Sequence, residues 1–172
     1  LLENIKSFAQ KMVVMRRYLA LVEKLDFQNH QEGWFLEAAQ VYCAAVNGLA
    51  HDLLQANLQS RGFLALRTYV MNYAHSQDFE SLVADATKLK ADLSAIEYCV
   101  TIKGLKVRVH RYESEADYSA EVEKTFEKFK QGAVKDYGAT LYAASGMSYV
   151  EAQILDYVAK LYPDAFASLH EF

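Results

Sequence analysis

Apolar residues recur every three or four positions through most of the chain, the spacing of one face of an α-helix. The first such stripe predicts a helix of about twenty residues, and its inner positions are Ile5, Phe8, Met12, Met15, Leu19 and Val22. A second stripe comprises Phe35, Ala38, Tyr42, Ala45 and Leu49 and continues to Leu53 or Leu54. The first third of the chain is therefore predicted to form two helices that pack through these stripes.

Two serines mark the starts of further helices, because a serine hydroxyl can accept a hydrogen bond from a free amide of the first helical turn. The helix after Ser60 carries Phe63, Leu66, Tyr69, Val70 and Tyr73. The helix after Ser76 carries Phe79, Leu82, Val83, Ala86, Leu89 and Leu93.

Two more helices are predicted in the last third of the chain. The fifth begins at Asp117 or Ser119 and carries Val122, Phe126 and Phe129. The last begins at a capping box formed by Ser148 and Glu151 and ends before Pro163, which cannot continue a helix. Its apolar positions are Ile154, Tyr157, Val158 and Leu161.

The pattern changes to alternation between Tyr98 and Tyr112, which is typical of a β-strand. One set of alternating positions is Leu105, Val107 and Val109, and the other is Lys106, Arg108 and His110. Residues 98–102 are rich enough in β-branched and aromatic types to form a partner strand, and Gly104 can take the positive φ of a tight turn. We therefore predict a mainly α fold, an elongated multi-helix bundle with a β-hairpin inserted at about residues 97–112.

Charge makes this hairpin a candidate binding site. The formal net charge of −4 gives the chain no overall nucleic-acid signature, so any anionic partner must be bound locally. No acidic residue lies between Tyr98 and Tyr112, and the candidate DNA-binding residues there are Lys103, Lys106, Arg108 and Arg111. The alternative is a small edge ribbon whose lysines discourage pairing with other strands.

The sequence offers little chemistry for catalysis, so we expect no enzyme activity from this chain. None of the five histidines is spaced as a metal-ligand pair with another histidine or a cysteine, and Cys43 and Cys99 lie far apart. No phosphate-binding loop of the P-loop type is present. No apolar run approaches the ~18 residues of a membrane span, and two isolated cysteines suit a reducing compartment, so a cytoplasmic location is expected.

Short strings along nearly the whole chain resemble the core and lever region of the MutS family of DNA mismatch-repair ATPases, most of all the shorter MutS-like proteins. These strings are Ile5-Lys6-Ser7-Phe8-Ala9, Trp34-Phe35-Leu36-Glu37-Ala38, Phe79-Glu80-Ser81-Leu82, Arg111-Tyr112-Glu113, Asp117-Tyr118-Ser119, Thr125-Phe126-Glu127-Lys128-Phe129, Val150-Glu151-Ala152-Gln153-Ile154-Leu155 and Ala165-Phe166.

The resemblance implies a helical region that lies between mismatch-reading and connector domains and a C-terminal ABC-type ATPase. In that family a β-rich clamp between two lever helices grips the DNA backbone, and its place corresponds here to the hairpin with Lys103, Lys106, Arg108 and Arg111. The hairpin is too short to wrap a duplex. Phe35-Leu36-Glu37 matches the letters of the family's Phe-x-Glu mismatch wedge but lies in a helical stripe in the wrong region, so that role is not assigned.

Residues 1–172 are accordingly expected to be a single core/lever domain, a non-catalytic fragment of a longer DNA-binding ATPase that relays motion between its ATPase domain and DNA. The fragment is expected to bind no cofactor, with ATP and Mg²⁺ bound elsewhere in the parent protein. Its expected partners are the DNA backbone, bound weakly and without sequence preference, the parent's own ATPase domain and a second copy of the parent, with no membrane.

The alternative function is a helical protein-interaction or dimerisation scaffold with a purely structural hairpin. DNA contact is favoured if Lys106, Arg108 and Arg111 lie together on one exposed face without carboxylate partners. Neutralisation by Glu113 and Glu115 favours the scaffold.

Overall fold

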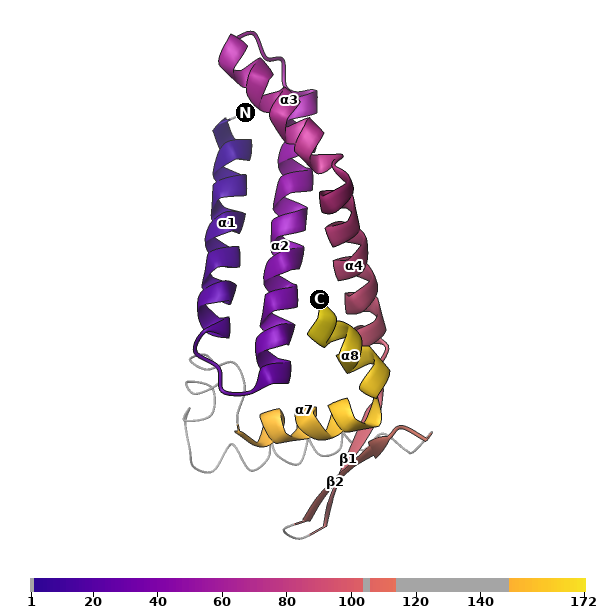
Figure 1. Ribbon diagram of the computed structural model, residues 1–172. Coiled ribbons are helices and arrows are strands. Elements are labelled where there is room, and N and C mark those ends of the chain that lie inside the picture. The colour runs from indigo at the N-terminus through magenta and orange to yellow at the C-terminus, as the bar shows by residue number, and fades with distance from the viewer. Residues whose placement is uncertain (1, 104–105, 114–148) are drawn as a thin grey trace. The chain divides into compact units, whose positions relative to one another are not determined.

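The computed structural model describes residues 2–103, 106–113 and 149–172 (Figure 1). Its elements are α1 (Leu2–Val22), α2 (Gln28–Gln55), α3 (Arg61–Ala74), α4 (Gln77–Ser94), β1 (Tyr98–Lys103), β2 (Lys106–Arg111), α7 (Tyr149–Leu161) and α8 (Pro163–Glu171). The predicted mainly α fold with one inserted hairpin is confirmed. The predicted fifth helix and Ser148 of the capping box lie outside the described residues.

The chain divides into two compact units. Unit 1 comprises Leu1–Ile96 and Tyr162–Phe172, and so contains α1 to α4 and α8. Unit 2 comprises Glu97–Leu161 and contains the hairpin and α7. A single domain over residues 1–172 stays a prediction.

Helix α2 is the central element of unit 1, since it contacts α1, α3, α4 and α8 (Figure 1). Its 28 residues correspond to about 42 Å of helix. Helix α1 has no buried residue and packs on α2 through one half-buried face. Among the described helices, α2 covers the predicted stripe of α1 only partly, so this stripe is a contact surface without a buried core.

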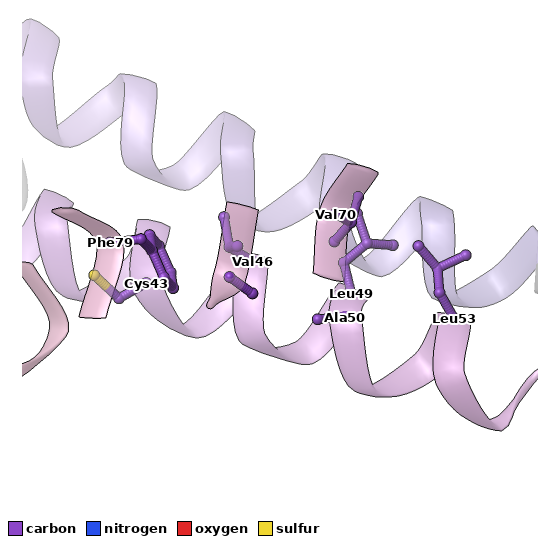
Figure 2. Close-up of a cluster of buried hydrophobic side chains, with 8 residues drawn as sticks. Cys43, Val46, Leu49, Ala50, Leu53, Val70 and Phe79 are labelled. Atoms are coloured by element: carbon purple, nitrogen blue, oxygen red, sulfur yellow. The ribbon is translucent and has the colours of Figure 1, made fainter. Parts of the chain in front are cut away.

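The main hydrophobic cluster lies where α2, α3 and the start of α4 meet (Figure 2). Its buried residues are Cys43, Val46, Leu49, Ala50, Leu53, Val70, Ala74 and Phe79. The side chains from α2 follow the helical period, so the second predicted stripe is confirmed from Ala38 onward. Burial also raises the pKa of the Cys43 thiol, which disfavours the reactive thiolate.

The assignment of Phe35 to the buried stripe is wrong. Phe35 is exposed, and its neighbour Leu36 is buried instead. Leu36 joins a second cluster with Ala86, Leu89 and Leu169, so this part of α2 faces α4 and α8. The ring of Phe35 contacts the edge of Phe172 with 6.0 Å between ring centroids.

Helix α8 follows α7 after a break at Tyr162. Pro163 ends the α7 pattern as predicted, but it also occupies the first turn of α8, where its missing N–H costs no hydrogen bond. Burial of Leu169 and a contact of 2.7 Å between His170 Nδ1 and Glu32 Oε1 attach α8 to α2. The sequence analysis missed this helix.

Both predicted serine caps are confirmed. The Ser60 hydroxyl accepts a hydrogen bond from the Phe63 amide at 3.2 Å, and the Ser76 hydroxyl accepts one from the Phe79 amide at 3.4 Å. The second cap separates α3 from α4, which lets both helices follow the surface of α2. Gln40 Nε2 links α2 to α4 by donating to the Ala86 carbonyl oxygen at 3.3 Å.

Tyr42 and Tyr73 share a hydrogen bond of 2.6 Å between their hydroxyl oxygens. Burial, followed by this bond, raises the pKa of Tyr42 above its usual value of 10.0. The folded state therefore favours the neutral phenol. The resulting stability is fully present below pH 10 and is lost as the pH rises further, because the unfolded chain then ionises more readily than the folded one.

We therefore expect the free energy of unfolding to fall above about pH 10 by up to ~1.4 kcal/mol per pH unit from this group. Tyr42→Phe removes that part of the loss. Urea denaturation at a series of alkaline pH values measures the difference between the two proteins. Tyr157→Phe, which changes an exposed tyrosine, serves as the matched control. Equal pH dependence in all three proteins contradicts the prediction.

Candidate nucleic-acid interface

The hairpin of unit 2 has the predicted antiparallel pairing. Tyr98 pairs with Arg111 at one end and Lys103 with Lys106 at the other. A hydrogen bond from the Tyr112 amide to the Glu97 carbonyl oxygen, at 3.4 Å, extends the ladder by one further pair. The predicted change of period at this place is confirmed.

Alternation along the strands separates the hairpin into two faces. We define the cationic face by Lys106, Arg108 and His110 of β2 and the residues paired with them, Lys103, Thr101 and Cys99. The apolar face is defined by Val107, Val109 and Arg111 and their partners Ile102, Val100 and Tyr98. Three of the four predicted DNA-binding residues thus share one face, and Arg111 belongs to the other.

Lys106 and Arg108 are exposed. Within residues 2–103, 106–113 and 149–172, neither side chain has an ion-pair partner. The register also sets Lys103 opposite Lys106.

Arg111 has a different environment from Lys106 and Arg108. Its Nη2 donates a hydrogen bond of 2.6 Å to the carbonyl oxygen of Leu161, the last residue of α7. The last carbonyl groups of a helix lack intrahelical donors and favour a nearby cation. Arg111 therefore joins β2 to the end of α7, and the sequence alone did not reveal this contact.

His110 adds polar groups to the cationic face. Its Nδ1 lies 3.0 Å from the Arg111 carbonyl oxygen, and its Nε2 lies 3.2 Å from the Thr101 hydroxyl. A carbonyl oxygen can only accept, so Nδ1 carries a proton and donates it. The contact between Nε2 and the Thr101 hydroxyl braces the two strands across this face.

Glu113 and Glu115 are the carboxylates that the sequence indicated could neutralise the cationic face. The extended ladder adds exposed Glu97, which pairs with Tyr112 at the base of this face. Glu113 is exposed and forms no ion pair with Lys106 or Arg108. Glu115 lies outside the described residues. The described part of the hairpin therefore meets the condition for phosphate contact only in part. Lys106 and Arg108 share an exposed face, whereas Arg111 lies on the other face.

The other described residues provide weaker candidates for a binding site. No group of three or more His, Cys, Asp or Glu side chains among them could bind a metal ion. A shallow groove between α4 and α8 is lined by Asp85, Lys88, Leu89, Asp92, Ser168, Glu171 and Phe172. Its charges are mixed and mainly negative, which does not suit an anionic ligand. No helix in the described part is long and apolar enough to cross a membrane.

Comparison of the chain with protein-family models, with curated proteins and with solved structures finds no match.

Proposed function

We propose that this chain is a non-catalytic module of a larger DNA-binding protein and that its hairpin contacts the phosphate backbone through the cationic face. The observation that carries the proposal is the exposure of Lys106 and Arg108 on one face, with no carboxylate partner among the described residues. Phosphate contacts of this kind position a protein on DNA without reading its sequence.

The contact is expected to be weak. With Arg111 bonded to α7, at most Lys103, Lys106 and Arg108 remain for phosphates on this face. Three neutralised phosphates correspond to a salt slope of about −2.7 in a plot of log K against log salt. Proteins with useful affinity make more contacts, so the dissociation constant is ~100 μM or weaker near physiological salt.

The resemblance to the MutS core and lever region supplies the mechanical part of the proposal. Helix α2 is packed against four other helices, and such packed elements move as bodies between discrete arrangements. Unit 1 is proposed to relay motion between DNA and an ATPase domain that binds ATP and Mg²⁺ in the same cytoplasmic polypeptide. If two parent chains pair, the first hairpin that binds DNA raises the effective concentration of the second, so two weak contacts give a tighter complex than one. A polypeptide whose continuation beyond Phe172 lacks a nucleotide-binding loop contradicts the lever role.

A second candidate is a helical protein-interaction scaffold. Helix α3 favours it, because Tyr69 is 71% exposed and Phe63 is also exposed on the same helix. Exposed aromatic side chains are common in protein interfaces. In that case the hairpin has only a structural role.

The charge of the hairpin distinguishes these candidates. We expect Lys106→Gln combined with Arg108→Gln to weaken duplex DNA binding and to reduce the salt slope by about 1.8, since two phosphate contacts are lost. Fluorescence anisotropy of a labelled duplex, measured from about 50 mM salt upward, gives both quantities.

Lys24→Gln combined with Lys88→Gln is the matched control, because it removes the same charge from exposed positions of unit 1. This control is expected to change binding little. If both double variants lose the same affinity, the attraction is only a long-range effect of net charge. If neither loses any, the scaffold is the better function.

A further inference from the structure

Tyr112 continues the cationic face beyond the end of β2. It follows Lys106, Arg108 and His110 in the alternation, and its amide pairs with Glu97 in the extended ladder. Its side chain is 44% exposed. The face therefore runs from a cationic end near the turn to an exposed aromatic ring at the base of the hairpin, where Glu97 is the paired neighbour of Tyr112.

The spacing of these positions suits an extended chain. Alternate residues of a strand are about 6.8 Å apart, so Lys106 and Tyr112 are about 20 Å apart along the ribbon. Duplex phosphates wind about the helix axis once every ~10 base pairs, so a straight face follows one duplex backbone over only a short distance. A single strand has no fixed helical path and can follow the whole face.

Insertion of the ribbon into a major groove is the main competing geometry, since that groove admits a two-stranded ribbon. The apolar face exposes Val100 and Val107, which offer phosphates neither charge nor hydrogen bonds. The same face also carries Tyr98 and Arg111, and Arg111 is bonded to the Leu161 carbonyl oxygen. The cationic face therefore makes the contact in either geometry, and base stacking distinguishes a single strand from a duplex.

An exposed phenol ring contributes to nucleic-acid binding when a base can stack on it. Bases in a duplex are already stacked and paired, whereas those of a single strand are available. We infer that the cationic face binds single-stranded nucleic acid in preference to duplex, with phosphates at Lys106 and Arg108 and a base on Tyr112. This inference rests on the proposed function and specifies that its nucleic-acid ligand is an unpaired strand.

Anisotropy titrations with labelled oligo-dT, oligo-U and a duplex, each about 15 nucleotides long, test the inference. Either single strand is expected to bind at least about 5-fold more tightly than the duplex, since one stacked base adds this much. Tyr112→Leu is expected to remove that advantage and to leave duplex binding unchanged. Tyr112→Phe keeps an aromatic ring and is therefore expected to keep the preference for single strands.

Tyr157→Leu removes an exposed tyrosine of α7 and is the matched control, and circular dichroism verifies that each variant is folded. Duplex binding as tight as single-strand binding, or a Tyr112→Leu variant that keeps the single-strand preference, overturns the inference. The proposed function still stands in that case if Lys106→Gln with Arg108→Gln weakens all three probes. If the double variant weakens none of them, the proposed function fails as well.

Discussion

Leu53→Ala is expected to lower the free energy of unfolding by about 3–5 kcal/mol. Leu53 is 0% exposed and lies in the cluster shared by α2, α3 and α4. Removing its side chain loses the transfer free energy of the buried groups and leaves a cavity that long, packed helices cannot close. Urea denaturation followed by circular dichroism measures the change.

Leu54 offers a matched control at the next position of the same helix, because it is 55% exposed. Leu54→Ala makes the same chemical change where little packing is lost, so we expect a change within ~0.5 kcal/mol. Equal losses for the two variants would show that α2 does not present the face described here.

Phe79→Ala is expected to cost a similar amount, about 3–5 kcal/mol. Its ring is 2% exposed, and its centroid lies 6.1 Å from that of Tyr42 and 5.2 Å from that of Tyr73. The ring thus connects α4 to both α2 and α3 just after the break between α3 and α4. Thermal and urea denaturation measure the loss, and near-ultraviolet circular dichroism reports the packing of the two tyrosines.

Phe63→Ala is the control for this change, since Phe63 is 40% exposed in the first turn of α3. It is expected to cost much less than Phe79→Ala and to leave the tyrosine signal intact. A Phe79→Ala protein with unchanged stability and an unchanged tyrosine signal contradicts the packing of the junction.

The proposed DNA contact and the stability of the helical body involve different residues. Lys106 and Arg108 are exposed in unit 2, whereas Leu53 and Phe79 are buried in unit 1. Charge changes on the cationic face are therefore expected to alter binding with little effect on the unfolding of unit 1. This separation makes a loss of DNA affinity in the double glutamine variant interpretable as a loss of contacts.

Local features of the sequence were sufficient to predict several elements. Ser60 and Ser76 mark helix starts because a capping hydroxyl bonds to an amide only three residues away. The alternation from Lys106 to His110 predicts a strand, and a hairpin brings its partner from the adjacent sequence. In each case the stabilising interaction is short in sequence, so no distant residue is needed to recognise it.

Only the tertiary structure decided the features that depend on distant partners. Leu36 is buried and Phe35 exposed because α4 and α8 cover one side of α2, and the short helix α8 depends on Leu169 reaching that cluster. The helical period is compatible with either Phe35 or Leu36 in the buried stripe, so periodicity alone does not assign which of them is buried. In the sequence, Arg111 is one of the four candidate DNA-binding cations of the hairpin, and only the approach of α7 gives it the Leu161 carbonyl oxygen as an acceptor. The sequence by itself determined α1 to α4, α7 and the hairpin through local periodicity and capping, whereas contacts between distant segments decided which of their faces are buried.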